Sequence, residues 1–177
     1  GIFTISEKLH TGEPDNRRMV LIGGGTGLAP FISYALHMKA IGSKRQIVVL
    51  HGASYVDELS YRELLTELEE ESVDKGRDKW DFYYRASISR PQEWFNRSWG
   101  GQRGRVETFL RPKAGSDRSP LEELVGEKIT TENTSFYVCG WQGTVDGSID
   151  YLVPKGFVTE RNKRKDGSYE VKFESYG

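Results

Sequence analysis

The chain has 177 residues, of which 36% are hydrophobic and 29% are charged, and its formal net charge is −1. This length and composition suit a single domain with a buried core, and the balanced charge gives no indication of nucleic-acid binding. The one cysteine, Cys139, excludes an intrachain disulfide and an iron–sulfur cluster, and the three histidines lack the spacing of a zinc site. No apolar run approaches the roughly 20 residues of a membrane helix. We therefore expect a cytoplasmic protein without a metal site, a nucleic-acid partner or a membrane partner.

Short apolar runs alternate with segments of helical periodicity along the chain. In chain order, the patterns predict a strand at 19–23, a helix at 27–42, a strand at 46–52, a helix at 58–71, a strand at 79–89, short helices at 105–112 and 119–126, a strand at 135–140, a weaker helix at 144–156, and a last strand or extended tail at 168–177. The strands are short and apolar on both faces, which is typical of a parallel sheet covered on both sides. The predicted fold class is therefore α/β, a Rossmann-like parallel sheet of about five strands with helices on both faces.

Local residues indicate where the helices begin and end. Gly42 follows the first helix as a stop signal. Ser60 is the expected N-cap of the second helix, and Glu63, three residues later, would complete a capping box. Pro120 suits the first turn of the short helix at 119–126.

The segment after the first strand, GGGTGLAP at 23–30, carries very little side chain. In a doubly wound sheet, ligands bind at the carboxyl ends of the strands, where the strand order reverses. Glycines there let the backbone approach a pyrophosphate, and the N-terminus of the next helix supplies free N–H groups. The segment is not a P-loop, and Pro30 stands where the G-x-G-x-x-G fingerprint has its third glycine. The alternative is a tight strand-to-helix turn that holds no ligand.

Five motifs, in order along the chain, resemble those of the ferredoxin–NADP reductase family. They are GTGLAPF at 25–31, HGAS at 51–54 with DELSYREL at 57–64, SISR at 87–90 followed by GQRGRV at 101–106, FYVCG at 136–140, and KDGSYEVKFESYG at 165–177. Each motif is weak alone, but five in order form a specific pattern. The last motif resembles the C-terminus of the bacterial branch, which ends in Glu-x-Tyr and one more residue. GIFTI, at the start of the chain, resembles the end of the flavin-binding barrel that precedes this domain in the family.

The resemblance implies a domain organisation and a reaction. Residues 1–10 would be the end of a preceding flavin-binding barrel, and residues 11–177 would be an NADP(H)-binding domain with a C-terminal tail facing the flavin. The reaction would be hydride transfer between NADP(H) and FAD in a ferredoxin(flavodoxin)–NADP reductase, with FAD bound mainly by a domain absent from this chain. Ferredoxin or flavodoxin would be the electron partner, and this chain alone would be inactive.

The glycine loop would hold one half of the nucleotide. By resemblance, Gly25, Thr26 and Gly27 face the nicotinamide and pyrophosphate, and Pro30 begins the following helix. The fixed φ of proline suits a first helical turn, where the N–H that it lacks would have no partner inside the helix.

The segment after the third strand would select the nucleotide. Ser89 and Arg90 match a Ser/Thr-Arg pair that holds the 2′-phosphate in the family, and Arg105 matches a second arginine there. A planar guanidinium can bind such a phosphate bidentately. The alternative is that both arginines are ordinary surface residues. The family also stacks a tyrosine on the adenine; its equivalent is not identified, and the aromatic candidates are Trp94, Phe95 and Trp99.

Four further residues would lie near the chemistry. By resemblance, Cys139 lies beside the reacting nicotinamide carbon, where it contributes shape and polarity, and Gly140 lets the ring approach. Tyr176 would stack on the flavin where nicotinamide must later sit, and Glu174 would assist proton movement and charge balance. The alternatives are a buried packing cysteine and an exposed tail. Trp141 departs from the family pattern, which continues with a polar residue and a methionine.

Two other functions remain compatible with the motifs. One is the reductase component of an oxygenase or flavohaemoprotein system, which uses the same hydride step with another acceptor. The other is a non-catalytic NADP-binding regulatory module, which the departure at CGWQG keeps open.

Overall fold

The structure, a computed structural model, describes residues 5–176, so the segment GIFT at 1–4 and Gly177 lie outside the described residues. The strands of this part are β1 Arg18–Gly24, β2 Ile47–Ala53, β3 Phe82–Ile88, β4 Gln102–Arg103, β5 Thr134–Trp141 and β6 Val171–Tyr176. The α-helices are α1 Ala29–Ala40, α2 Arg62–Lys75, α3 Pro120–Val125 and α4 Gln142–Leu152. The short 3₁₀ helices are η1 Val56–Glu58, η2 Trp94–Asn96, η3 Val106–Leu110, η4 Val153–Lys155 and η5 Glu160–Asn162.

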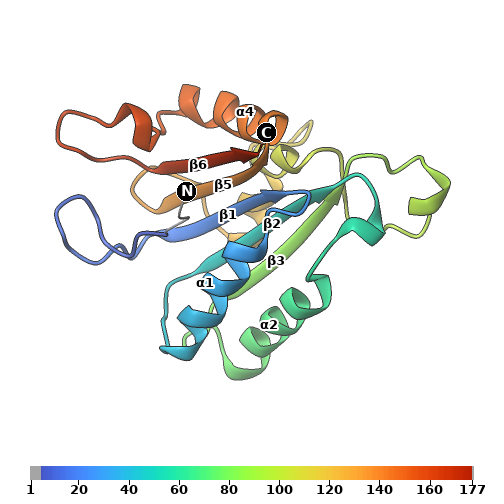
Figure 1. The fold of residues 1–177 in the computed structure, drawn as a ribbon, viewed down its shortest axis with the longest axis horizontal. Coiled ribbons are helices and arrows are strands. Elements are labelled where there is room, and N and C mark those ends of the chain that lie inside the picture. The colour runs from blue at the N-terminus through green and yellow to red at the C-terminus, as the bar shows by residue number, and fades with distance from the viewer. Residues whose placement is uncertain (1–4, 177) are drawn as a thin grey trace.

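The described strands form one parallel sheet in the order β4-β3-β2-β1-β5-β6 (Figure 1). The register places Gly24 of β1 opposite Gly52 of β2, and Gly23 opposite Cys139 of β5. The chain runs outward from β1 to β4 on one side and then returns to add β5 and β6 on the other. The strand order therefore reverses between β1 and β5, and this is the point where open α/β sheets bind ligands.

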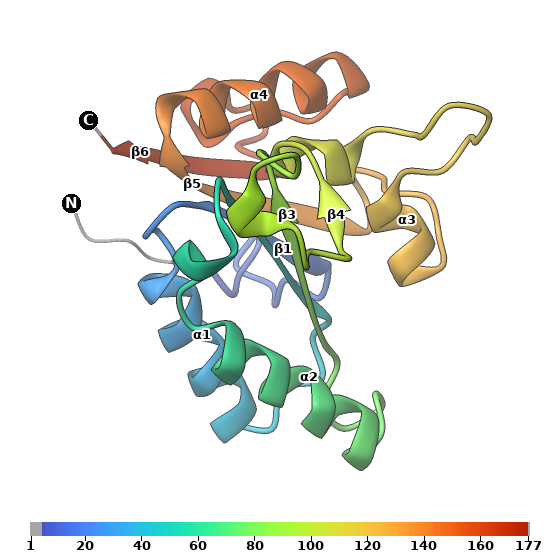
Figure 2. The ribbon, with the colours of Figure 1, turned by 90° about the vertical axis from the view of Figure 1, so that its right-hand side faces the viewer.

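Helices cover both faces of the sheet, as the apolar strands predicted. Figure 2 shows α1 and α2 on one side of the sheet and α4 on the other. The core has two corresponding layers because alternate side chains of each strand point to opposite faces. Leu21, Val49 and Phe31 belong to the layer under α1, whereas Val20 and Val145 belong to the layer under α4. The predicted α/β fold is confirmed, with the segment at 168–177 supplying a true strand, β6.

Two helix boundaries agree with the sequence signals. Pro30 lies in the first turn of α1, and Gly42 follows the helix with a φ of 69°. This is the left-handed region, where a glycine after a helix end releases the chain without steric cost. Ser119 caps α3 by accepting a hydrogen bond from the Glu122 N–H at 3.1 Å, and Pro120 is the first helical residue.

The prediction that Ser60 caps the second helix with Glu63 is wrong. The helix begins at Arg62, its N-cap is Tyr61 with a φ of 62°, and no side chain caps it. The Ser60 hydroxyl instead points back toward the Glu58 carbonyl. The left-handed turn at Tyr61 rotates the chain after Ser60, so the serine no longer faces the free N–H groups.

The helix predicted at 105–112 is a 3₁₀ helix, η3, and not an α-helix. Side chains three residues apart eclipse one another in a 3₁₀ helix. Val106 and Phe109 are spaced in this way, and both are buried in the core layer under α4. The tighter helix thus places two apolar side chains on the sheet within a very short segment.

Candidate functional site

The carboxyl ends of β1 and β5 meet at the point where the strand order reverses. Their backbones approach so closely that a Cβ built on Gly140 would lie 3.2 Å from the Gly24 nitrogen. A Cβ on Gly24 would lie 2.7 Å from Thr144 Oγ1, on the first turn of α4. Only glycine fits at these positions without a shift of the neighbouring atoms. Both glycines are buried, so the carboxyl ends of β1 and β5 pack with their backbones in close contact beside the start of α4.

The loop between β1 and α1 presents its main chain to this edge. Gly25 has a φ of 65°, in the left-handed region that favours glycine. Thr26 is exposed at the tip of the loop, and Pro30 is partly buried in the first turn of α1. No side chain caps α1, so its first N–H groups remain available to an anion. The exposed tip at Thr26 and the start of α1 thus suit an anion, whereas Gly27 is buried.

His51 supports this loop from within the sheet and was not anticipated from the sequence. Its side chain is fully buried at the end of β2, and its Nε2 lies 3.0 Å from the Gly25 carbonyl oxygen. Burial lowers the pKa of His51, while the bond to Gly25 partly opposes that shift. The neutral ring therefore holds the Gly25 peptide by donating its Nε2–H. Periodicity marks His51 only as part of an apolar strand, so its partner could not be predicted.

The C-terminal strand brings three of the predicted chemical residues together. Tyr176 Oη lies 2.7 Å from Cys139 Sγ, and Glu174 is opposite Cys139 in the β5–β6 register. Burial raises the pKa of Cys139, as does the charge of Glu174, while the bond to Tyr176 lowers it. The net shift keeps Cys139 a neutral thiol, which suits a contribution of shape and polarity. The ring of Tyr176 also covers Gly27, where a built Cβ would lie 2.8 Å from Oη.

Trp141, the departure from the family pattern, lies across the glycine loop. Its Nε1 would be 3.1 Å from a Cβ on Gly25, and its side chain is 61% exposed. An exposed indole beside a phosphate cradle offers a flat apolar surface and one N–H donor. Trp141 therefore forms one wall of the candidate site.

Ser89 and Arg90 lie at the end of β3, as the sequence predicted. The Arg90 guanidinium packs 5.7 Å from the ring centre of Tyr55 and donates to its hydroxyl at 3.3 Å. Buried Asn96 holds this region together by donating to the carbonyls of Ser54 and Arg90 at 2.9 and 2.8 Å. Sequence reasoning missed Tyr55 and Asn96, because neither belongs to a periodic pattern or a motif.

Arg105 makes its contacts elsewhere along the same edge. It donates to Glu107 at 2.9 Å, and its Nη2 lies against the first turn of α4, 2.8 Å from a Cβ built on Gly143. Within residues 5–176, its side chain forms no hydrogen bond or ion pair with Ser89 or Arg90. The three residues predicted to hold one phosphate are therefore not brought together by direct contacts.

The three aromatic candidates differ in their surroundings. Trp94 and Phe95 are 70% and 78% exposed, whereas Trp99 is partly buried and donates to the Gln102 carbonyl. Phe95 packs edge-to-face on Tyr55, with ring centres 6.5 Å apart. Of the three, Phe95 is thus the one attached to the group formed by Tyr55 and Arg90.

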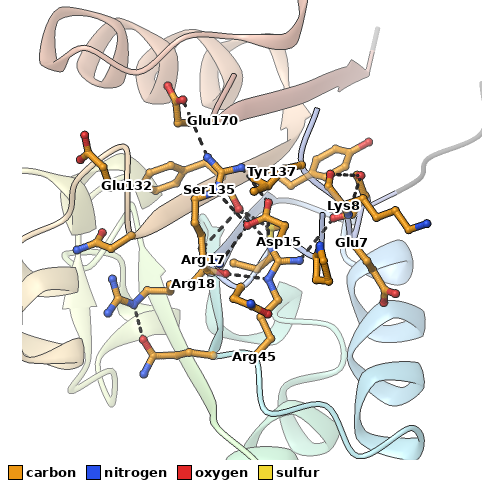
Figure 3. Close-up of a pocket in the computed structure, with 18 of the residues that line it drawn as sticks. Glu7, Lys8, Asp15, Arg17, Arg18, Arg45, Glu132, Ser135, Tyr137 and Glu170 are labelled. Carbon is orange, nitrogen blue, oxygen red and sulfur yellow. Dashed lines mark hydrogen bonds and ion pairs between the residues drawn. The ribbon is translucent and has the colours of Figure 1, made fainter. Parts of the chain in front are cut away.

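A larger hollow lies at the opposite, amino end of the sheet, and its charges are compensated by one another. Figure 3 shows Asp15 between Arg17 and Arg45, with ion-pair distances of 2.8 and 3.3 Å. Burial would raise the pKa of Asp15, but the Arg17 hydrogen bonds and the Arg45 charge hold it below its ordinary value. Glu170 is paired with Arg164 at 2.6 Å. These pairs indicate a structural role for this end of the sheet.

Residues 5–176 contain neither a cluster of metal-ligating side chains nor a membrane-spanning helix. This part of the chain contains no group of three or more His, Cys, Asp or Glu side chains arranged to bind a metal ion. No helix within these residues is long and apolar enough to cross a membrane.

The chain is similar in sequence to known oxidoreductases. The family model described as "Oxidoreductase NAD-binding domain" matches residues 21–148. One subunit of the Na(+)-translocating NADH-quinone reductase of Marinomonas sp. (strain MWYL1) is 31% identical over 123 residues, which cover 69% of this chain and 26% of that protein. The chain thus spans about a quarter of the length of that curated relative.

Solved structures share the fold. A ferredoxin NADP+ reductase from Neisseria gonorrhoeae with bound FAD and NADP has a TM-score of 0.66 at 24% identity, over 92% of this chain and 57% of that one. A flavohemoglobin from Malassezia yamatoensis with bound FAD and heme has a TM-score of 0.57 at 16% identity, over 92% of this chain and 32% of that one. At these identities the likeness is one of fold.

Proposed function

We propose a function on the basis of the family to which the chain belongs, the oxidoreductase NAD-binding domain family. The family resemblance and the NAD(P)-binding role predicted from the motifs are confirmed at this level. Beyond it, we propose that the chain binds NADP(H) and orients it for hydride exchange with FAD in a ferredoxin(flavodoxin)–NADP reductase. The flavin would be bound mainly by protein outside residues 11–177, and residues 1–10 would be the end of that flavin-binding barrel.

The observation that carries the proposal is the backbone cradle between β1 and β5. Added Cβ atoms at Gly24 and Gly140 would meet neighbouring atoms at 2.7 and 3.2 Å, so the strand ends pack closely, and the accessible backbone surface is at Gly25 and Thr26 of the following loop. A dinucleotide needs such a surface because its diphosphate binds backbone N–H groups at a helix N-terminus. We place the diphosphate over Gly25, Thr26 and Gly27, at the start of α1.

The nicotinamide end of the cofactor would lie toward β5 and β6. The cofactors supply the redox chemistry, and the protein supplies binding and orientation. Cys139 and Gly140 would shape the position of the ring, and Glu174 would provide the nearby negative charge. Tyr176 now covers Gly27 and contacts Cys139, so its ring would have to move before nicotinamide could occupy that space. The tail would thereby control access to the reacting carbon.

The adenosine end would lie toward β2 and β3, where Ser89 and Arg90 would hold a 2′-phosphate. The relatives differ in their nucleotide: the solved ferredoxin reductase holds NADP, and the quinone-reductase relative is named for NADH. That relative favours a second candidate function, a reductase component that uses NADH and passes electrons to another acceptor. Arg90 supports the NADP assignment because it is exposed and charged beside Tyr55.

Titration of the chain with 2′,5′-ADP and with 5′-AMP tests the NADP assignment. A hydrogen bond to a charged group contributes about 1.5–3 kcal/mol. The dissociation constant of 2′,5′-ADP should therefore be lower than that of 5′-AMP by a factor of about ten or more. Arg90→Gln should remove this preference. Arg97→Gln is the control: it removes a different exposed arginine, which stacks on Trp94, and should leave the preference intact. Equal affinity of the unaltered chain for both ligands would favour the NADH-dependent candidate instead.

We further propose ferredoxin or flavodoxin as the electron partner and the cytoplasm as the compartment. The fold shared with a ferredoxin NADP+ reductase supports the choice of partner. A spectroscopic titration of the full-length protein with reduced ferredoxin would test the electron transfer directly. A protein that transfers electrons only to a quinone would contradict this partner.

A further inference from the structure

The outer strand of the sheet, β4, is much shorter than β3 beside it. β4 pairs with Ser87 and Ile88, so residues 82–86 of β3 have no strand on their outer side within the part of the chain that the structure describes. A bare strand edge offers N–H and C=O groups with which another chain can pair. The partners of these backbone groups therefore decide whether the edge is open.

Phe82 and Tyr84 direct their backbone groups to the outer side. The Ile47 N–H of β2 donates to the Asp81 carbonyl at 2.9 Å, so Asp81 faces β2. Backbone groups alternate in direction from one residue of a strand to the next, which turns those of Phe82 and Tyr84 away from β2. Each of the two residues thus presents one N–H and one C=O to the outer side.

Ser72 of α2 binds the outward N–H of Phe82. It is buried on the same helix face as Leu65 and Leu68, a position where helical periodicity favours an apolar residue. Its Oγ accepts the Phe82 N–H at 3.1 Å. Arg77, just beyond the helix, donates to the same Oγ at 3.1 Å and to the Phe82 carbonyl at 2.9 Å. Both outward groups of Phe82 are therefore bonded to side chains.

An ion pair covers the outward groups of Tyr84. The Tyr84 N–H donates to the Glu69 carboxylate, and Arg85 donates to the Tyr84 carbonyl at 2.7 Å. Arg85 also donates to both Glu69 oxygens, at 2.7 and 2.8 Å. The side chains of Glu69 and Arg85 are 20% and 43% exposed, so the pair lies at the surface. Side chains thus take the place of a neighbouring strand along this part of the edge.

A hollow of about 880 Å³ lies beside this edge. It is lined by residues 84–86 of β3, by Val73 on the α2 side and by Leu124 on the α3 side. The main chain of another molecule has room to approach β3 there, so the barrier to strand pairing is the set of side chains already bonded to the edge. We refer to this set as the edge cap, which consists of Glu69, Ser72, Arg77 and Arg85.

We propose that the outer edge of β3 is a surface that fits a second copy of this chain, and that the edge cap keeps it closed. Two identical edges related by a two-fold axis would pair antiparallel, β3 against β3. With the edge cap in place, a second strand has to displace side chains from the backbone groups that it would bond. The chain therefore stays monomeric, and loss of the edge cap opens it to strand pairing. This role is independent of the nucleotide assignment.

Sedimentation velocity of the 177-residue chain over a range of concentrations tests the proposal. The unaltered chain should sediment as a monomer of 20.1 kDa. Glu69→Ala/Arg85→Ala frees the N–H and carbonyl of Tyr84, so its mass should rise with concentration toward twice that value. Lys39→Ala/Glu71→Ala is the matched control, because it removes another ion pair that involves α2 and leaves the net charge unchanged. This control should stay monomeric.

Hydrogen exchange at low and high protein concentration locates the contact. In Glu69→Ala/Arg85→Ala, exchange in β3 should slow as the concentration rises, and exchange elsewhere should not. A folded double variant that stays monomeric would overturn the proposal, and so would association that leaves exchange in β3 unchanged. Association of the control, or pairing of the unaltered chain through β3, would also contradict it. Should the double variant fail to fold, as judged by circular dichroism, Arg85→Ala alone frees the Tyr84 carbonyl, and the same two measurements decide.

Discussion

Gly27 is covered by the ring of Tyr176, and even a methyl side chain would not fit there. A Cβ on Gly27 would lie 2.8 Å from Oη and 2.9 Å from Cε2 of Tyr176. We expect Gly27→Ala to displace Tyr176 and to break its contact with the Cys139 thiol, which is 1% exposed. Because thiol reactivity depends on access, the rate of Cys139 modification by an aromatic disulfide reagent should rise several-fold.

Gly100 offers a matched control for this variant. A Cβ built on Gly100 would meet nothing within 4 Å, so Gly100→Ala should leave the modification rate unchanged. If Gly27→Ala reacts no faster than the unaltered chain, Tyr176 does not shield the thiol, and the proposed control of access by the tail loses its basis.

Burial of His51 predicts a specific pH dependence of stability. Burial lowers the pKa of His51 from its ordinary value of 6.5. Below about pH 6.5, His51 is therefore protonated in the unfolded chain but stays neutral in the folded chain until the pH reaches the lowered pKa. The free energy of unfolding should therefore decrease as the pH falls from 6.5 toward the lowered pKa. His51→Gln retains an N–H donor for the Gly25 carbonyl and does not titrate, so it should flatten the curve in this window.

Urea unfolding at a series of pH values between about 7.5 and 5.5 measures this effect. A curve for His51→Gln as steep as that of the unaltered chain would show that other groups cause the pH dependence. The carboxylates titrate mainly below this window, so they do not obscure the comparison.

At the scale of residues, the sequence predicts which residues lie at the site better than it predicts which of them contact one another. Gly25 and Cys139 could be placed at one edge because each lies at the carboxyl end of a parallel strand, and such strands end at the same side of a sheet. The contact between Cys139 and Tyr176 depends on the register of β6, which no local pattern specifies. The contact of Arg105 with Glu107 likewise depends on how η3 packs under α4, and a motif cannot report that packing.

At the scale of elements, two serines with the same sequence signal have different roles. Ser119 accepts a hydrogen bond from the Glu122 N–H, and the Glu122 carboxylate accepts one from the Ser119 N–H at 3.0 Å. Ser119→Ala should therefore cost about 1 kcal/mol in the free energy of unfolding. Ser60→Ala should change it by less than about 0.5 kcal/mol, because Ser60 caps no helix.

Chemical denaturation of the two variants under identical conditions makes the comparison. Equal losses of stability would mean that Ser60 acts as a cap in solution, as its sequence context alone suggests. The pair is informative because both serines precede a glutamate by three residues, yet only Ser119 caps a helix.

Elements with strong periodicity were predictable, and those determined by packing were not. β1, β2 and β5 are nearly continuous apolar runs buried on both faces, and α1 has Pro30 in its first turn and is followed by Gly42. The two-residue β4 has no apolar pattern at all, since it exists only through its pairing with Ser87 and Ile88 of β3. The turn at Tyr61 also escaped prediction, because a left-handed φ is uncommon for tyrosine.

At the scale of the whole molecule, the two ends of the sheet have opposite character. At the amino end, Asp15 forms ion pairs with Arg17 and Arg45, and Glu170 forms one with Arg164, so these charges neutralise one another within the fold. The carboxyl end holds the exposed loop tip at Thr26, the N-termini of α1 and α4, which no side chain caps, and the exposed Arg90 and Arg105, of which Arg105 is paired with Glu107. The parallel strands impose this asymmetry, because every helix that follows a strand begins at the same edge.

This asymmetry supports binding of a nucleotide but does not provide for its oxidation. The described residues form one sheet with its covering helices, and the ferredoxin NADP+ reductase of similar fold is longer, with this chain covering 57% of it. We expect the 177-residue chain to bind NADP+ in a calorimeter and yet to show no NADPH-dependent reduction of ferricyanide, with or without added FAD. Hydride transfer requires the donor carbon about 3–3.5 Å from its acceptor, and free flavin in solution is not held there. A complete flavin reductase assayed in parallel is the positive control. Robust turnover by the chain with added FAD would mean that the flavin binds to these residues after all, and the division at residue 10 would be wrong.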